Sequence, residues 1–316
     1  MMGAVRDVCV IGLGLIGGSV LRAAKAAGRT VWGATASKED ADNARAEGFD
    51  IVSVDEALSR NPEALVVLAV PMPALPDLLR KVPEGTRLTD VTSVKGPVHD
   101  AVHRYAPAAR FVGGHPMAGT SKSGWGAGSR TLFENAAWVV TPEEADEHLN
   151  DVIQLALDLG AHVVPTTPEE HDEAVARISH LPHIMAAILA AVGADGGPLA
   201  MALAAGSFGD GTRVAGSRPE LVRAMCEGNR DALLMAVDDA LGRLGAARGS
   251  LASTGGLAKT IEAGHEGRKA LVNQPQRTKI TIDLTKPGAL AALRNLGSRG
   301  GRVVGLNGST AQAETS

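Results

Sequence analysis

The segment from Val8 to Ala27 constrains the fold of this chain most, because it joins a short apolar run, a glycine loop and an alanine-rich stretch. The apolar run Val8–Ile11 is rich in β-branched residues, and the sequence Gly-Leu-Gly-Leu-Ile-Gly follows at once. The stretch from Ser19 to Ala27 then has the composition of a helix. The order of strand, tight turn and helix predicts the opening unit of an α/β domain.

Each glycine of the loop has its own physical role in a dinucleotide-binding turn. Gly12 permits the tight turn, Gly14 lets a pyrophosphate approach bare backbone, and Gly17 allows the helix to pack closely on the strand. The phosphates would then meet the helix N-terminus. A purely structural strand–helix turn is the alternative. We assign cofactor contact to the whole loop: Gly12, Leu13, Gly14, Leu15, Ile16 and Gly17.

Short apolar runs continue to alternate with helix-like segments as far as Pro165. We expect strands at Thr30–Gly33, Ala64–Val70, Arg87–Val91, Arg110–Gly113, Trp138–Val140 and His162–Val164. We expect helices at Lys38–Glu47, Pro97–Tyr105 and Glu143–Leu159. This alternation predicts a doubly wound, Rossmann-type parallel sheet over residues 1–165, with ligands at the carboxyl ends of its strands.

The chain changes character after Pro168 and becomes rich in alanine, leucine and methionine with helical periodicity. We expect helices at Glu169–Val192, Leu221–Ala247 and Thr254–Glu262, and hence an all-helical domain over residues 166–270. The apolar faces of these helices are broad. We therefore expect a homodimer formed through this domain.

The tail over residues 271–316 has a pattern of its own. Strand-like Lys279–Ile282, a helix from Pro287 through Leu296 and strand-like Val303–Leu306 precede a polar end, Ser309–Ser316. This β-α-β order is similar to the first half of an ACT regulatory domain, and we expect a truncated copy. A unit this small cannot bury its own faces, so it either packs on its neighbour or is completed across a dimer.

Composition excludes several functional classes. The 31 basic and 35 acidic residues give a formal net charge of −4 with no dense basic stripe, so nucleic acid is not an expected partner. Cys9 and Cys226 have neither metal nor disulfide spacing, which fits a reducing cytosol. No export signal is apparent, and the apolar run Ile184–Val192 is about half the length that spans a bilayer. We expect a cytoplasmic protein.

The sequence Gly-Gly-His-Pro at positions 113–116 places His115 in a turn after a predicted strand. Imidazole is the side chain best able to exchange a proton near neutral pH. A His-Pro pair alone is often structural, but here it lies downstream of a dinucleotide-binding signature. Pro71 and Ser93 also directly follow predicted strands, so the three stretches would meet at one crevice.

The end of the second predicted strand lacks the acid that often binds the ribose hydroxyls of NAD. Thr35 and Ser37 could instead donate hydrogen bonds to a 2′-phosphate, and Lys38 could supply charge, which tilts the prediction slightly towards NADP. Ser37 is equally a favourable helix N-cap, since Asp40 follows three residues later. Both interpretations stay open.

Two polar clusters stand out in the helical half. His180 and His183 lie three positions apart, which would allow both to bind one metal ion. No further ligands accompany them at convincing spacing, so we predict no metal site. Core or helix-capping roles are the alternative to metal binding. In the second cluster, Arg213 suits bidentate capture of a substrate carboxylate, and a structural salt bridge to Asp210 is the alternative.

In combination, these motifs resemble the prephenate and arogenate dehydrogenase family of tyrosine biosynthesis. The resemblance extends over roughly residues 5–265. Its segments, in order, are Gly12–Ser19, Thr92–Gly96, Gly114–Thr120, Ser179–His183 and Asp210–Arg213. The glycine loop occurs in many dehydrogenases, whereas the ordered combination is specific.

The resemblance implies oxidation of the ring hydroxyl carbon of prephenate by hydride transfer to the nicotinamide, with loss of the ring carboxylate as carbon dioxide. His115 matches the catalytic histidine that accepts a hydrogen bond from the ring hydroxyl, and Ser93 matches a serine that orients it. His183 and Arg213 match residues that hold the carboxylate end of the substrate, and Ser179 is a weaker member of that pocket.

The chain departs from the family pattern at Ser121, where some relatives carry an acid of an ionic gate. Because this chain lacks that acid, it lacks a charge that would distinguish arogenate from prephenate. Arogenate dehydrogenase is therefore the alternative activity. A β-hydroxyacid dehydrogenase or imine reductase is a further alternative, although it would use a helical-domain lysine, for which only Lys259 is available. A non-catalytic NAD(P)-sensing protein belongs to another class, and His115 and Arg213 argue against it.

Overall fold

The computed structural model describes residues 7–120, 122–273 and 276–315. They form two units. Unit 1 contains the chain up to His171 together with Thr278–Thr315, and unit 2 contains Asp172–Arg277. The tail that we treated as a third segment is thus part of unit 1, and the first boundary falls at residue 171 instead of 165.

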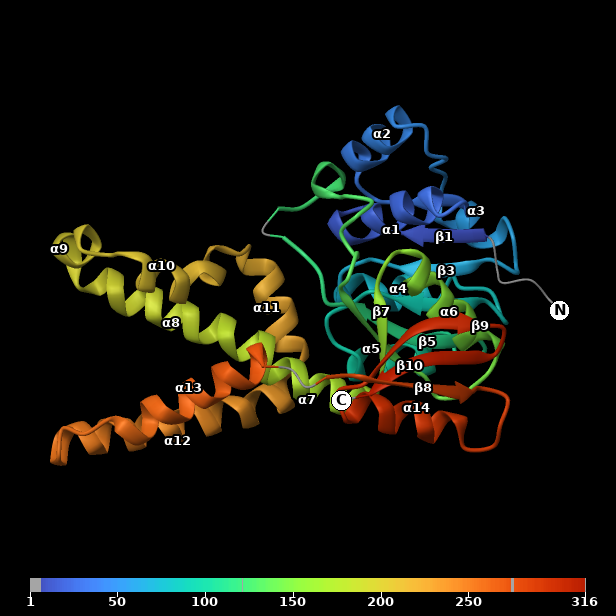
Figure 1. The fold of residues 1–316 in the computed structure, drawn as a ribbon. Helices are drawn as coiled ribbons and strands as arrows, with labels where there is room; N and C mark the ends of the chain where they lie inside the picture. The colour runs from blue at the N-terminus through green and yellow to red at the C-terminus, as the bar shows by residue number, and fades with distance from the viewer. Residues whose placement is uncertain (1–6, 121, 274–275, 316) are drawn as a thin grey trace. The chain divides into compact units, whose positions relative to one another are not determined.

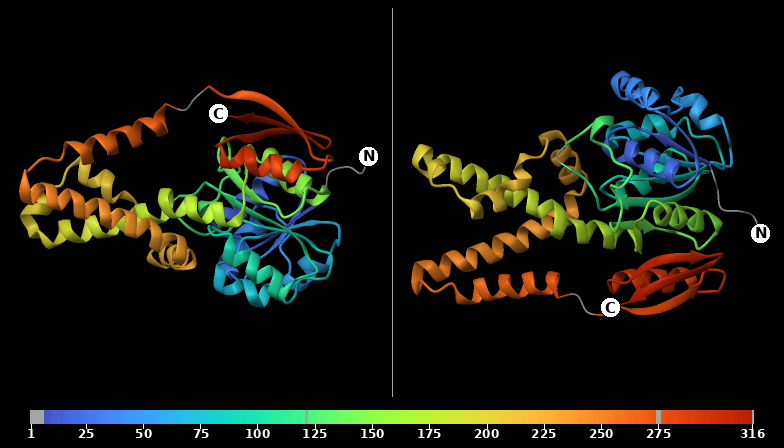
Figure 2. Two further views of the ribbon diagram at one scale, coloured as in Figure 1. Left: turned by 90° about the horizontal axis from the view of Figure 1, so that it is seen from below. Right: turned by 45° about the horizontal axis from the view of Figure 1, so that its top comes forward.

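Unit 1 is built on one ten-stranded sheet with helices on both faces (Figures 1 and 2). The spatial order of its strands is β2-β1-β3-β4-β5-β6-β7-β9-β10-β8. The strands are β1 Asp7–Ile11, β2 Thr30–Ala34, β3 Leu65–Leu68, β4 Arg87–Asp90, β5 Arg110–Pro116, β6 Ala137–Thr141, β7 His162–Pro165, β8 Thr278–Asp283, β9 Arg302–Asn307 and β10 Thr310–Thr315.

Alternation along the strands divides the core of unit 1 between the two faces of the sheet. Val8 and Val10 of β1 belong to one buried cluster, whereas Cys9 and Ile11 belong to the other. The helices that accompany the sheet are α1 Leu15–Ala26, α2 Lys38–Ala46, α3 Val54–Ser59, α4 Leu75–Leu79, α5 Gly96–Tyr105, α6 Glu147–Asp158 and α14 Ala289–Ser298, with short 3₁₀ turns at Met72–Ala74 and Trp125–Ala127.

The predicted Rossmann-type sheet is present, but it is parallel only as far as β5. Strands β2, β1, β3, β4 and β5 pair in parallel, and β6 then pairs antiparallel with β5. The strand β5 also continues through Pro116, so His115 lies within a strand and not in the turn that we expected. The chain thus reverses its direction between β5 and β6, and Pro116 pairs with Trp138.

The tail extends this sheet instead of forming an independent β-α-β unit. Strand β9 meets β7 through the pair Val163–Val303, and β10 lies between β9 and β8. The segment Thr310–Thr315, which we expected to be a polar end, is the strand β10, in which Ala311 and Ala313 are buried. Helix α14 packs so closely that a Cβ at Gly297 would lie 1.6 Å from the Pro165 carbonyl oxygen.

Unit 2 is all-helical, as predicted, but its helices are interrupted twice. Helix α7, Pro168–Val175, passes through a π-helical turn, Ala176–His180, into α8, because Pro182 lacks the N–H that a regular helix would need there. The predicted helix Leu221–Ala247 is two helices separated at Asn229. The remaining elements are α8 Leu181–Asp195, α9 Gly197–Ala202, α10 Gly206–Thr212, a 3₁₀ turn Arg213–Gly216, α11 Pro219–Gly228, α12 Arg230–Ser253 and α13 Ala258–Val272.

Asn229 accounts for the second interruption. Its side chain is buried, and its Nδ2 donates to the Asp172 carbonyl oxygen at 2.7 Å and to His180 Nδ1 at 3.0 Å. These bonds tie the junction of α11 and α12 to the π-helical turn. His180 is therefore the core histidine that we gave as the alternative to a metal ligand.

Large apolar side chains are exposed along the helices of unit 2, including Ile188, Leu244 and Leu251. The helical run Pro168–Asp195 is long and apolar enough by length and composition to cross a membrane, and only 22% of its most apolar window is buried. This is a longer apolar helix than the run Ile184–Val192 that we considered from the sequence. An apolar helical surface of this extent is typical of an interface.

His148 on α6 makes the stability of unit 1 dependent on pH. It is 1% exposed, and its Nε2 donates to the Leu88 carbonyl oxygen at 2.9 Å. Burial lowers the pKa of His148 below 6.5, so the unfolded chain takes up the proton first as the pH falls. The stabilisation is complete above about pH 6.5 and is lost as the pH falls towards the folded pKa.

We predict that the free energy of unfolding, measured in urea, decreases as the pH is lowered from 7 to 5. In His148→Gln this decrease should be smaller by on the order of 1 kcal/mol over the same interval, so the slope against pH is shallower. Glutamine keeps a donor for the Leu88 carbonyl and does not titrate. The exposed His265 provides a matched control, since His265→Gln should leave the slope unchanged. If His148→Gln had the same pH slope as the unmodified protein, His148 would not be a source of the pH dependence.

Candidate active site

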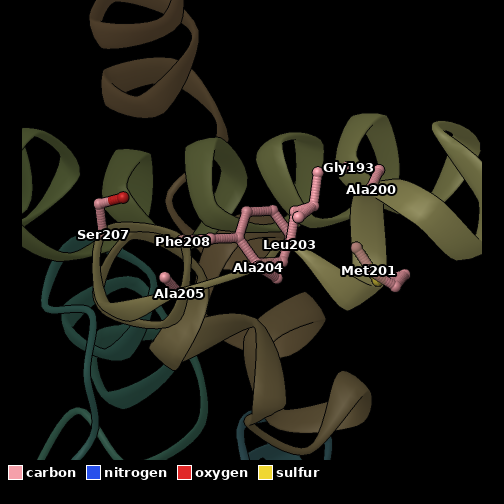
Figure 3. Close-up of a pocket in the computed structure, with 8 residues that line it drawn as sticks. All are labelled: Gly193, Ala200, Met201, Leu203, Ala204, Ala205, Ser207 and Phe208. Carbon is pink, nitrogen blue, oxygen red and sulfur yellow. The ribbon is translucent and has the colours of Figure 1, made fainter.

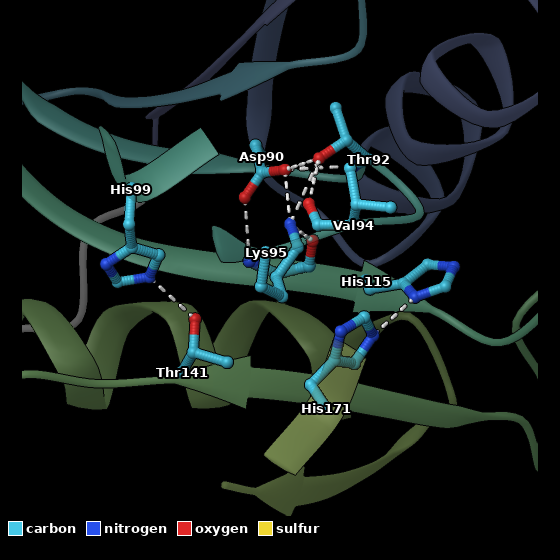
Figure 4. A network of polar contacts seen from close by, with 9 residues as sticks. Asp90, Thr92, Val94, Lys95, His99, His115, Thr141 and His171 are labelled. Carbon is cyan, nitrogen blue, oxygen red and sulfur yellow. Dashed lines mark hydrogen bonds and ion pairs between the residues drawn. The ribbon is translucent and has the colours of Figure 1, made fainter. Parts of the chain in front are cut away.

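A buried ion pair holds the backbone around His115. Asp90 at the end of β4 and Lys95 before α5 are both fully buried, and Lys95 Nζ lies 2.5 Å from Asp90 Oδ2 (Figure 4). Lys95 Nζ also donates to the Gly114 carbonyl oxygen at 2.6 Å, and the Gly114 N–H donates to Asp90 Oδ1 at 2.9 Å. Both backbone groups of the residue before His115 are therefore bound to one ion pair.

Thr92 completes this network. Its hydroxyl donates to Asp90 Oδ2, its backbone N–H donates to the same oxygen at 2.9 Å, and it accepts from Lys95 Nζ at 3.1 Å. The loop that carries Ser93 is thus bound on both sides of that residue. The charges are compensated by each other and by backbone groups, which is the condition under which a buried pair is tolerated.

The two glycines before His115 make the network possible. A Cβ at Gly113 would lie 2.3 Å from Thr141 Oγ1, and one at Gly114 would lie 2.5 Å from the Asp90 carbonyl oxygen. Any larger side chain would push β5 away from its neighbours. Glycine is therefore required at both positions by the close approach of the neighbouring strands β6 and β4.

His115 is half-buried, and its Nδ1 lies 2.8 Å from Nε2 of His171 (Figure 4). The two rings meet edge to face, with centroids 5.1 Å apart and planes at 73°. His171 is itself 2% exposed and stands on the first turns of α7. One nitrogen of His115 is therefore engaged by a buried second histidine.

A capping box positions His171. The Thr167 hydroxyl accepts from the Glu170 N–H at 3.2 Å, and the Glu170 carboxylate accepts from the Thr167 N–H at 3.4 Å and from the Thr166 hydroxyl at 2.7 Å. The sequence Thr-Pro-Glu-Glu-His was the available signal for the helix start. It did not identify His115 as the partner of His171, because that contact spans 56 residues.

Ser93 is half-buried in the loop after β4, as expected, at the same sheet edge as the end of β5. Within the described part of the chain, no hydrogen bond joins Ser93 to His115, and the contact on His115 Nδ1 comes from His171. In the Thr-Ser-Val-Lys motif, Lys95 bonds directly to Gly114, the residue before His115, and Thr92 bonds to Asp90 and Lys95.

The glycine loop after β1 fits a dinucleotide pyrophosphate. Gly12 has a positive φ of 99°, and a Cβ there would lie 2.3 Å from the Ala69 carbonyl oxygen. A Cβ at Gly17 would lie 1.9 Å from the Gly12 carbonyl oxygen, whereas one at Gly14 would meet nothing within 4 Å. Gly12 and Gly17 therefore close the turn, and Gly14 leaves open space in front of the α1 N-terminus for an anion.

The residues after β2 serve the start of α2. Ser37 Oγ accepts from the Asp40 N–H at 3.2 Å as the N-cap, Thr35 Oγ1 accepts from the Ser37 N–H at 3.3 Å, and the exposed Lys38 pairs with Asp42 at 2.5 Å. Hydrogen bonding from Lys38 lowers the pKa of Asp42. The capping interpretation of Ser37 is confirmed, and the end of β2 carries no carboxylate, as the sequence indicated.

Ser179 and His183 lie on consecutive turns in unit 2. His183 Nδ1 donates to the Ser179 carbonyl oxygen at 2.8 Å, and the Ser179 hydroxyl points to Met225 Sδ at 3.9 Å. Because Nδ1 donates to the backbone of its own helix, Nε2 is the His183 nitrogen that could bind a ligand. His180, three residues earlier, is fully buried, so the two histidines do not share one environment.

Arg213 begins the 3₁₀ turn that packs against α8, the helix of His183. Its side chain is exposed, as is that of Asp210. Among the described residues, no ion pair links the two, so the structural salt bridge that we offered as an alternative is not formed. Ser121, where some relatives carry an acid, lies outside the described residues.

A small pocket in unit 2 does not involve these residues. It is formed where α8, α9 and α10 meet (Figure 3), and its wall is largely apolar. The lining residues are Gly193, Ala200, Met201, Leu203, Ala204, Ala205, Ser207 and Phe208. They carry no ionisable group, so this pocket offers no acid–base chemistry.

Comparison with known proteins identifies the family. The model for the nucleotide-binding domain of prephenate dehydrogenase matches residues 20–165, and the model for the dimerization domain of the same enzyme matches residues 167–255. The chain belongs to the prephenate dehydrogenase family. The family, the fold class and the class of enzyme, an NAD(P)-dependent dehydrogenase, are as predicted from the sequence.

Individual relatives agree with this assignment. Prephenate dehydrogenase of Bacillus subtilis is 36% identical over 75% of this chain and 68% of its own length. A Corynebacterium glutamicum crystal structure, assigned as a prephenate dehydrogenase, is 41% identical with a TM-score of 0.86, covering 95% of this chain and 99% of that one. Prephenate dehydrogenase from A. aeolicus, in complex with hydroxyphenyl propionate and NAD+, is 25% identical with a TM-score of 0.77, covering 86% of this chain and 100% of that one.

We predict that Lys95→Met lowers the free energy of unfolding by about 3–5 kcal/mol, because Asp90 is left as an unpaired charge in a fully buried site. Urea denaturation measures this loss. Lys81→Met is the matched control, since the exposed Lys81–Asp55 pair should contribute less than about 1 kcal/mol. Equal, small losses in both variants would show that the buried pair is not a structural requirement.

Proposed function

We propose that this protein catalyses the NAD(P)-dependent oxidative decarboxylation of prephenate to 4-hydroxyphenylpyruvate in the cytoplasm, as a step of tyrosine biosynthesis. The observation that carries the proposal is the placement of His115 at the carboxyl end of β5, in a chain of the prephenate dehydrogenase family. The glycine loop that fits a pyrophosphate belongs to the same unit.

His115 would promote the reaction by accepting a hydrogen bond from the ring hydroxyl of prephenate. As the C–H electron pair leaves as hydride, the C–O bond gains carbonyl character, and the histidine stabilises the partial positive charge on the hydroxyl proton. The bond to the ring carboxylate then breaks, its electron pair enters the ring, and carbon dioxide leaves. The nicotinamide, when bound, supplies the hydride acceptor.

His171 would set the tautomer that this role requires. A neutral imidazole carries one N–H, so His115 can accept at Nε2 only if its proton is on Nδ1. Nδ1 lies 2.8 Å from His171 Nε2, which can accept that proton's hydrogen bond. We therefore assign His115 as the catalytic residue and His171 as its positioning residue. Ser93 keeps the supporting role that the family resemblance gives it.

Substrate binding is assigned to unit 2 on the same resemblance. Arg213 is exposed and can bind a carboxylate bidentately, and His183 has Nε2 available because Nδ1 is bonded to Ser179. Asp210 supports a second candidate, arogenate, because its exposed carboxylate makes no ion pair among the described residues and would suit an ammonium group. Prephenate stays the favoured substrate, since Arg213 and His183 can both donate hydrogen bonds to the keto acid side chain that distinguishes it from arogenate.

The cofactor proposal keeps both nicotinamide dinucleotides, with a lean towards NADP. The end of β2 carries no acid to repel a 2′-phosphate, and Thr35 and Ser37 stand there. The pairing of Lys38 with Asp42 reduces the charge that Lys38 could offer to a phosphate. We also propose a homodimer, because the family model for residues 167–255 describes a dimerization domain and the helices of unit 2 expose large apolar side chains.

A steady-state assay of the four combinations of prephenate or arogenate with NAD or NADP tests the function. We expect prephenate to be favoured in kcat/KM, and NADP to be used at least as well as NAD. A kcat/KM for arogenate about tenfold or more above that for prephenate, equivalent to about 1.4 kcal/mol, would reverse the substrate assignment. Absence of turnover with both substrates would contradict the proposed function.

Variants of the two histidines test the mechanism. His115→Asn should lower kcat by roughly 10²- to 10⁴-fold with little change in cofactor binding. His171→Leu should lower kcat roughly 10- to 100-fold with KM for prephenate almost unchanged, because it misplaces the base without removing it. His171→Gln, which restores an acceptor, should recover most of the activity. A nearly unchanged kcat in His115→Asn would remove His115 from the mechanism.

A further inference from the structure

A second group of histidines lies on α5, outside the machinery proposed above. His99 and His103 lie four positions apart (i and i+4), which places them on one face of the helix. Glu143, in the connection between β6 and α6, faces them. One ligand atom from each of the three side chains lies within 4.8 Å of the others.

The carboxylate of Glu143 stands between the two imidazoles. His99 Nδ1 is 3.2 Å from Glu143 Oε1, and His103 Nε2 is 3.2 Å from Glu143 Oε2. Two aromatic nitrogens and one carboxylate thus converge from two separate elements of unit 1. His103 and Glu143 are exposed, so an ion can reach the cluster from solvent.

The buried member of the cluster is oriented by a second group. His99 is 5% exposed, and its other nitrogen, Nε2, lies 2.9 Å from Thr141 Oγ1 (Figure 4). When the threonine oxygen accepts from Nε2–H, the lone pair of Nδ1 faces Glu143 and His103. Metal-ligating histidines typically have their second nitrogen fixed in this way.

We propose that His99, His103 and Glu143 form a binding site for a first-row divalent cation, with Zn²⁺ as the best match. Two imidazoles and one carboxylate are a common zinc ligand set, and water would complete the tetrahedron. Mg²⁺ and Ca²⁺ prefer oxygen ligands and are poorly suited to a site with two nitrogens. A bound ion would join α5 to the connection between β6 and α6 and stabilise unit 1.

Calorimetric titration of the tag-free, EDTA-treated protein with ZnCl₂ tests the site. We expect one saturable site per chain, with affinity reduced at least about tenfold in His103→Ala and in Glu143→Gln. His265→Ala is the matched control, because His265 is also an exposed histidine on a helix but belongs to no such cluster among the described residues. It should bind zinc as the unmodified protein does.

The orienting threonine gives an independent readout. Thr141→Val should weaken zinc binding by about 10- to 100-fold, whereas Thr141→Ser, which keeps the hydroxyl, should retain it. Zinc should raise the melting temperature of the unmodified protein and of His265→Ala, but not of His103→Ala. Lack of saturable binding to the unmodified protein, or equal binding by His103→Ala and Glu143→Gln, would overturn the proposal.

Discussion

The ion pair between Asp90 and Lys95 is the interaction on which the rest of unit 1 depends. It is fully buried, and it binds both the N–H and the carbonyl of Gly114, the residue that precedes His115. An isolated charge in such a place would be strongly destabilising, so each charge requires the other and the polar groups around them. The ion pair thereby fixes the backbone that leads into His115.

The antiparallel strand β6 is the second requirement of the site. By running back beside β5, it lets the chain return through α6 to β7, which is parallel to β6. The chain that follows β7 contains the Thr167–Glu170 capping box and then His171, which contacts His115. An all-parallel continuation would have required another crossover, and the two histidines would not face each other in the same way.

Local chemistry determined how much of this could be predicted from the sequence. The β1–glycine loop–α1 unit was predictable because two of its requirements, the close packing of Gly17 on the Gly12 carbonyl oxygen and the open space at Gly14, arise within the loop itself. The helix cap at Ser37 was predictable for the same reason. The extension of β5 through His115 was missed, because glycine and proline indicate a turn unless a neighbouring strand such as β6 supplies hydrogen bonds.

The contacts that the sequence did not reveal are long-range. Asp90 and Lys95 lie close in sequence, but their structural role depends on their bonds to Gly114. The role of His171 depends on its contact with His115, which is 56 residues away. The alternation of apolar residues in Thr310–Thr315 was hidden by polar neighbours, so a buried strand looked like a polar end. The partner of His171 is far away in the sequence, whereas β10 pairs with β9 directly before it and with the more distant β8.

The tail shows why such partners matter for the site as well as for the fold. A Cβ at Gly297 of α14 would lie 1.6 Å from the Pro165 carbonyl oxygen, so the helix rests directly on the end of β7. Arg294 of the same helix donates to the Pro142 carbonyl oxygen at 2.6 Å, beside Glu143. The tail therefore supports the backbone that leads to His171 and the connection that carries Glu143. Because it shares these contacts, its strands and α14 belong to the scaffold of the catalytic unit and not to a separate module.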